Sequence, residues 1–230
     1  MLIRIGFFVG MLWLLTYSAV SQPTTSGRGI DDHLLIKESE KGLGEQGSSD
    51  VIGSPYLNET FAKGEVYFDK GNLTVVQQAR YNIYSDWVEY QQNNQTLVLD
   101  PDQRIRKVRI EDHVLIVDKY PTRGKIKHGY FTLLDSGKLM LLSKHVVNYR
   151  EPQAAGALES TARPAKYTRG PDEFYYKMGN GALKKVDSIK DLITDLPGNS
   201  EALKEFVKKE KISARKKEEL LKFVQYYNAL

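Results

Sequence analysis

Hydrophobic residues follow three different patterns along the chain. Residues 5–15 form an almost continuous apolar run. From residue 53 to about 149, short runs rich in Val, Ile, Leu, Tyr and Phe alternate with turn-forming pairs, which is typical of antiparallel strands. After residue 188, apolar residues recur at the spacing of amphipathic helices. The pattern therefore predicts a leader, a β-region and a helical end, in that order.

Residues 53–150 are predicted to form an antiparallel β-sheet. The runs at 87–90 and 96–99 illustrate the pattern, because Asn93 and Asn94 between them can take the left-handed conformations of a tight hairpin turn. Connections this short make strands that follow one another in the sequence pair with one another. The sequence therefore predicts a β-meander.

Two segments follow the predicted sheet. Residues 151–172 contain Pro152, Pro164 and Pro171 and few large apolar side chains. This composition predicts a long loop that is either disordered or functional, with disorder favoured. Residues 173–230 return to regular structure, as a β-hairpin followed by helices that pack on the sheet.

Three helices are predicted after the hairpin. Ser188 caps the first of them, and Ser213 starts the last. In the last helix, Leu220, Val224 and Tyr227 are spaced so that they share one face. Such an apolar stripe needs a surface to cover, and the exposed face of the meander is the nearest one. The predicted fold class is thus α+β, an antiparallel β-meander packed with C-terminal helices.

Residues 1–21 have the layout of a secretory signal peptide. Arg4 precedes the apolar run, and Ala19 and Ser21 provide small residues for cleavage before Gln22. A membrane anchor is the competing interpretation, but the run is shorter than the roughly 20 residues of a spanning helix. We therefore expect cleavage and export, to the periplasm or the extracellular space, with no membrane anchor after cleavage.

Composition separates the next segment from the rest of the chain. Residues 22–52 are rich in Ser, Thr, Gly and Asp, with too little apolar surface to offset the cost of ordering, which predicts a flexible tether. The whole chain of 230 residues is 41% hydrophobic and 27% charged, as in an ordinary soluble globular protein.

The absence of cysteine excludes several kinds of site. Disulfides, cysteine zinc sites, iron–sulfur clusters, thiol nucleophiles and a lipidated cysteine after the leader are all ruled out. The formal charge of +4 is spread among mixed charges, so no nucleic acid is expected as a partner. The sequence neither predicts nor excludes contact with a membrane surface.

Histidines and carboxylates were considered as candidate ligands and catalysts. No pair of histidines has the spacing of a metal site on one helix or strand; the four are His33, His113, His128 and His145. A cluster of acidic residues could serve acid–base hydrolysis, namely Asp100, Asp102, Glu111, Asp112 and Asp118. Most of these acids fall at predicted turns, where their side chains bond the local backbone. We therefore predict no catalytic, cofactor-binding or metal-binding residue, no cofactor, and a protein that is not an enzyme.

Two motifs resemble a family of exported proteins found in Bacteroidota. They are GSPYLNE at 53–59 and RYNIYSD at 80–86, and the close of the chain, FVQYYN at 223–228, is similar to that family's end as well. A signal peptide cleaved before Gln is also common in that phylum. The resemblance implies export and a domain from Gly53 to the C-terminus, and it brings no catalytic residue with it.

The sequence leaves three hypotheses for the function, each for a different class of protein. The leading one is a non-enzymatic binding or scaffolding module of the cell envelope or the secreted fraction, whose partner is unknown and could be an envelope protein. The alternative is a periplasmic carrier of lipid or another apolar ligand, held between a curved sheet and its covering helices. An enzyme that uses acidic residues or histidines is the least favoured. A large apolar cavity between sheet and helices would distinguish the carrier from the scaffold.

Overall fold

The computed structural model describes residues 51–69, 71, 73–101, 104–122, 124–155, 161–198 and 200–230. The predicted signal peptide at 1–21 and nearly all of the predicted tether at 22–52 lie outside these residues. Across the described ranges, no helix is both long enough and apolar enough to cross a membrane.

Within the described residues, ten strands form one antiparallel sheet, in the order β12-β11-β8-β7-β6-β5-β1-β2-β3-β4. Their bounds are β1 Ala62–Phe68, β2 Leu73–Asn82, β3 Trp87–Gln92, β4 Gln95–Leu99, β5 Ile105–Ile110, β6 His113–Thr122, β7 Lys125–Asp135, β8 Leu139–Lys144, β11 Glu173–Met178 and β12 Lys184–Lys185. The remaining two strands, β9 Val147–Arg150 and β10 Lys166–Arg169, pair with each other.

The strand order differs from one continuous meander. β1 to β4 form one meander and β5 to β8 a second, and the two join where Val66 of β1 pairs with Val108 of β5. The turn prediction holds between β3 and β4, where Asn93 and Asn94 have φ values of 51° and 60°. The join itself depends on the connection from β4 back to β5, which local turn chemistry does not specify.

In the part of the chain that the structure describes, three helices complete the fold, which confirms the predicted α+β class. They are α1 Ile189–Asp195, α2 Ser200–Glu210 and α3 Lys217–Ala229. The Ser188 side chain caps α1 by accepting a hydrogen bond from the backbone N–H of Asp191, at 3.1 Å. The last helix begins later than Ser213, whose backbone N–H is instead bonded by the Glu219 side chain.

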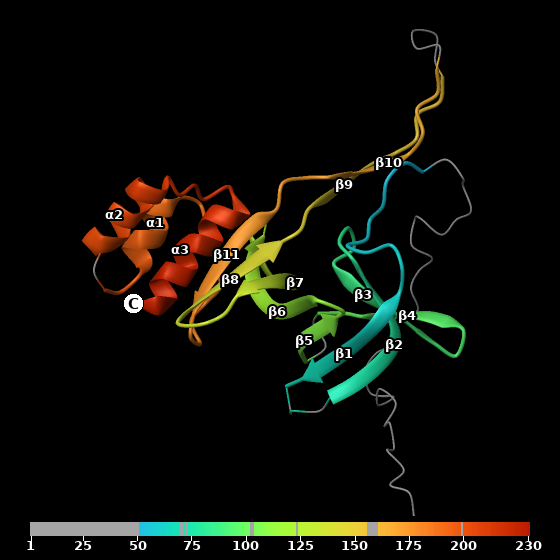
Figure 1. Ribbon diagram of the computed structural model, residues 1–230. Helices are drawn as coiled ribbons and strands as arrows, with labels where there is room; N and C mark the ends of the chain where they lie inside the picture. Colours follow the sequence, from blue (N-terminus) through green and yellow to red (C-terminus); the bar gives the residue numbers. More distant parts are fainter. Residues whose placement is uncertain are drawn as a thin grey trace, which may run out of the picture.

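The helices cover one face of β8 and β11 (Figure 1). Leu139 and Leu141 of β8 pack against Leu220, Phe223 and Val224 of α3, and all five residues are fully buried. Complete burial of such side chains contributes about 1.5–3 kcal/mol each. This apolar contact fixes the helices on the sheet.

A second core lies inside the curl of β1 to β7. Val66, Val88 and Leu115 are fully buried in it. Tyr130 of β7 donates a hydrogen bond from its hydroxyl to the carbonyl of Leu99 at the end of β4, although these strands lie far apart in the strand order. The sheet is therefore strongly curled, and side chains fill the inside of the curl.

The segment 151–172, predicted as a long loop, is partly paired. It contains β10, and beyond β10 Gln153 and Arg163 exchange two backbone hydrogen bonds of 2.8 Å each. Pro152 and Pro164 then face each other at the neighbouring position of the ladder, where no backbone N–H is required, so the prolines do not interrupt the pairing. We call residues 147–155 and 161–169 the arm, and Figure 1 shows it projecting away from the rest of the molecule.

Candidate functional site

The root of the arm is where the chain leaves the large sheet after β8 and returns to it before β11. His145 lies on the outgoing connection and Asp172 on the returning one. The Nδ1 atom of His145 is 2.9 Å from Oδ1 of Asp172, and the Ser143 hydroxyl donates to Oδ2 of the same carboxylate at 3.2 Å. These contacts join the outgoing and the returning connection at the root of the arm.

A third side chain extends this contact into the sheet. Thr132 Oγ1 of β7 lies 2.9 Å from His145 Nε2, so Asp172, His145 and Thr132 form a continuous chain. Burial alone would raise the pKa of Asp172, but the hydrogen bonds from His145 and Ser143 outweigh it and lower that pKa. The order Asp–His–hydroxyl is also that of a catalytic triad. Thr132, however, is only 9% exposed in the middle of paired strands. We therefore interpret this series of contacts as structural, holding the root of the arm on the sheet.

The N-terminal end of the described chain runs along β10. Ile52 donates a backbone hydrogen bond to Ala165 and accepts one from Tyr167, both at 2.9 Å. Gly53 has a φ of 78°, and a Cβ there would lie 2.4 Å from the Tyr167 carbonyl oxygen, so only glycine fits. The Arg169 guanidinium donates to the carbonyl of Tyr56. The segment that ends the predicted tether is thus a pairing partner of the arm.

Three tyrosines form the other contact at the root. Tyr149 of β9 and Tyr167 of β10 lie with ring centroids 4.8 Å apart. Tyr84, in the β2–β3 turn, is 5.9 Å and 5.5 Å from these two rings. Aromatic pairs of this kind contribute about 0.5–1.5 kcal/mol each beyond burial. The arm is therefore docked on the β2–β3 turn as well as on the N-terminal segment.

The β2–β3 turn is itself anchored by a partly buried ion pair. Asp86, with a φ of 58°, binds the Lys144 ammonium, the Tyr81 hydroxyl and the backbone N–H of Tyr130. The Lys144 ammonium also donates to the Tyr130 carbonyl at 3.0 Å. The two side chains thus bind the backbone N–H and carbonyl of Tyr130, a position of β7 that does not pair with β8. Burial lowers the pKa of Lys144, and the Asp86 carboxylate opposes that shift.

A buried polar network holds the N-terminal segment on β2 and β3. The Arg80 guanidinium binds the Glu89 carboxylate at 2.8 Å and lies over the rings of Tyr56 and Phe61, 3.7 Å and 4.2 Å from their centroids. Asn82 donates to the other Glu89 oxygen at 3.0 Å. Residues of both sequence motifs at 53–59 and 80–86 thus support the root of the arm.

The four acidic candidates that the structure describes do not form a pair. Asp100 follows β4, and Glu111 and Asp112 occupy the β5–β6 turn. Asp118, within β6, binds the Lys177 ammonium at 2.6 Å instead of another carboxylate. Asp102 lies outside the described residues.

The histidine candidates are also dispersed. His113 begins β6 and His128 lies on β7, and only His145 belongs to the root described above. His33 lies outside the described residues. In the part of the chain that the structure describes, no group of three or more His, Cys, Asp or Glu side chains could hold a metal ion.

Sequence reasoning missed the residues that build the root. Arg80, Glu89 and Lys144 are charged residues inside strands; Glu89 and Lys144 are buried, and the Arg80 side chain is 11% exposed. The signal of Glu89 and Lys144 in the sequence is a charge within an otherwise apolar run, whereas Arg80 follows two glutamines and an alanine and has no such signal. His145 and Asp172 carried no such signal, since the sequence shows them 27 residues apart.

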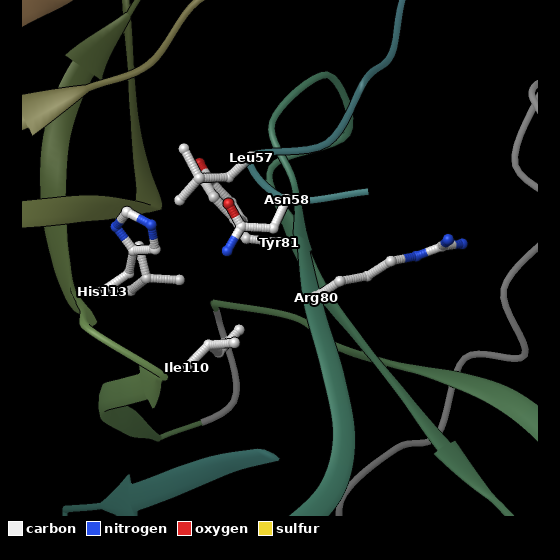
Figure 2. A pocket seen from close by; sticks show the side chains of 7 residues that line it. Leu57, Asn58, Arg80, Tyr81, Ile110 and His113 are labelled. Carbon is white, nitrogen blue, oxygen red and sulfur yellow. The ribbon is translucent and has the colours of Figure 1, made fainter. Parts of the chain in front are cut away.

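A small pocket opens between β2, β5 and β6, close to the N-terminal segment (Figure 2). It is lined by Leu57, Asn58, Arg80, Tyr81, Ile110, His113 and Leu115. Figure 2 shows the Arg80 guanidinium pointing away from it. Its cavity volume of about 10 Å³ is no more than one water molecule needs. Neither this pocket nor the fully buried contact between α3 and β8 supports the hypothesis of an apolar carrier.

Comparisons with protein-family models, with curated proteins and with solved structures find no match to this chain. The resemblance to exported proteins of Bacteroidota therefore stays a prediction.

Proposed function

We propose that this chain is an exported, non-enzymatic binding module. Its large sheet and the three helices, which we call the body, act as a scaffold that presents the arm to a partner. The observation that carries the proposal is the root of the arm. The root is fastened by the pairing with Ile52, by the three tyrosines, and by the contact between His145 and Asp172. A connection that only joined β8 to β11 would need none of these contacts.

The exposure of the arm supports the same function. At the root Ala165 and Tyr167 are buried, whereas further out residues 151–155 and 161–163 are all exposed. Ordering a segment costs about 1–2 kcal/mol per residue in backbone entropy. An arm that is already paired has met this cost before a partner arrives, which favours binding.

Site-specific photo-crosslinking in the native host tests the role of the arm. A photoreactive amino acid at Ala154, on the arm, is expected to form a discrete crosslinked product. The same group at Glu205, exposed on α2, is the matched control and is expected to form none. Tyr167→Ala, which loosens the root, should reduce the product at Ala154. Equal crosslinking from both positions, or none from the arm, would contradict the proposal.

Export is tested separately by N-terminal sequencing of the protein purified from its host. The proposal expects a mature N-terminus at or within a few residues of Gln22. Accumulation of a form that retains Met1 would contradict cleavage and the proposed location together.

A further inference from the structure

The β6–β7 hairpin extends beyond both of its neighbours in the sheet. β5 pairs with β6 only as far as Ile116, and β8 pairs with β7 only from Thr132 onward. The two strands nevertheless stay paired with each other up to Thr122 and Lys125. The end of the hairpin is therefore a two-stranded ribbon with no strand beside it in the described sheet.

Contacts at the base of this ribbon fix its direction. The Tyr120 ring packs edge-on against Phe131, with centroids 5.3 Å apart, and also against Tyr175 at 6.2 Å. Asp118 forms its ion pair with Lys177 of β11 on the same face. Beyond Tyr120 these contacts end. We call residues 121–122 and 124–127 the ribbon tip.

The ribbon tip exposes an apolar side chain. Ile126 is 75% exposed, the highest value among the large hydrophobic side chains in the described ranges. It pairs across the hairpin with Pro121, which is also exposed, so the two residues share one face of the ribbon. A single exposed hydrophobic side chain is ordinary on a protein surface. Its setting at the end of a projecting ribbon, among cations, is not.

The charges around Ile126 all have one sign. With Arg123 left out, residues 119–127 contain three lysines and no acidic residue. Lys119 lies on the face of Ile126, and Lys125 and Lys127 lie on the opposite face. All three lysines are exposed, and none forms an ion pair within the described part of the chain. The proposal makes no use of Arg123, which lies outside the described residues.

We propose that the ribbon tip binds the surface of an anionic phospholipid bilayer. Ile126 enters the boundary between headgroups and acyl chains, and the lysines on both faces contact lipid phosphates. Amphipathic surfaces that combine apolar side chains with lysines bind at this depth, and each Lys near an anionic leaflet adds about 1 kcal/mol, a factor of about five in affinity. A soluble polyanion would use the lysines and leave Ile126 in water. The proposal is independent of the partner of the arm.

Vesicle co-sedimentation tests the proposal with the processed protein purified from its host. Binding to phosphatidylcholine vesicles containing about 30% phosphatidylglycerol is expected to be at least about tenfold stronger than to pure phosphatidylcholine, and to weaken with added salt. Ile126→Ser should reduce binding about tenfold, because the apolar contribution is lost. The double variant K125E/K127E should reduce it further.

Two control variants make the test specific. Leu73→Ser replaces another exposed aliphatic side chain, 53% exposed on β2, and K208E/K209E reverses two exposed cations on α2. Both controls are expected to bind like the wild type. No preference for the anionic vesicles would overturn the proposal, and so would equal loss in the α2 control. Loss with the ribbon lysines but not with Ile126→Ser would also overturn it, in favour of a soluble polyanion.

Discussion

The two ends of the large sheet are stabilised in different ways. Where α1 to α3 cover β8 and β11, the buried contacts are almost entirely apolar, as at Leu220 and Phe223. In the curl of β1 to β7, and at the end of β8 where that strand leaves β7, the apolar core is accompanied by buried charges. Glu89 is 2% exposed and Lys144 is 8% exposed, and each is paired.

The difference follows from what covers each part of the sheet. A helix satisfies its own backbone hydrogen bonds, so its apolar face is sufficient to cover a sheet. The curled end is closed by irregular segments and by a strand edge, whose backbone groups need other partners. Asp86 and Lys144 supply these partners for Tyr130, and Arg80 stacks on Tyr56 of the N-terminal segment. At the curled end, polar side chains thus supply hydrogen bonds to backbone groups, whereas in a helix the backbone supplies them itself.

The largest expected effect breaks the apolar end. Leu220→Asp removes a fully buried leucine and leaves a carboxylate without a partner among apolar side chains. We expect a loss of more than about 5 kcal/mol in the free energy of unfolding, measured by urea denaturation. The control is Lys217→Asp, an exposed change in the first turn of α3, which should be close to neutral. Similar losses in both variants would show that the helix is not docked through Leu220.

The next effect breaks the polar end. Glu89→Ala leaves the guanidinium of Arg80, whose side chain is only 11% exposed, without its carboxylate, so we expect a loss of about 3–5 kcal/mol in the free energy of unfolding. Replacing both partners, with Arg80→Met and Glu89→Leu, should recover much of that loss because no charge stays unpaired. If the double variant is as unstable as the single one, pairing of the charges is not the reason for the effect.

A smaller effect tests how closely the ion pair fits the sheet. A Cβ at Gly129 would lie 2.7 Å from Asp86 Oδ2 and 2.8 Å from Lys144 Nζ. Gly129→Ala should therefore cost about 1–3 kcal/mol by displacing the pair, as seen by thermal unfolding. An unchanged temperature of unfolding in Gly129→Ala would argue against crowding at this position.

The smallest effect concerns Asp172 and depends on pH. The pKa of Asp172 is lowered in the folded state, so its contacts contribute stability above its ordinary pKa near 4 and lose it as the pH falls through the folded value. Asp172→Asn should cost about 1 kcal/mol at pH 7, because the carboxylate is partly exposed. The difference from wild type should shrink below about pH 4. A difference that stays constant from pH 7 to pH 3 would contradict this account.

The same contrast explains what the sequence could predict. The stripe of Leu220, Val224 and Tyr227 and the turn at Asn93 are local patterns, and the structure places them as predicted. The pairing of β1 with β5 and the contact of His145 with Asp172 join residues distant in the sequence, so no local pattern specifies them. The prolines of 151–172 predict a break in regular structure. These prolines fall where the ladder needs no N–H, so β10 and the contact between Gln153 and Arg163 form in spite of them.

Hydrogen–deuterium exchange of the wild-type protein tests the central claim, that the body holds the arm in a fixed conformation. The account predicts slow exchange for the backbone amides of Tyr167 and Ile52, at rates comparable with β3 and β4. Tyr167→Ala should speed exchange at the root of the arm and leave α3 unchanged. Exchange of residues 147–150 and 166–169 at the rate of an unfolded chain in the wild type would contradict the claim.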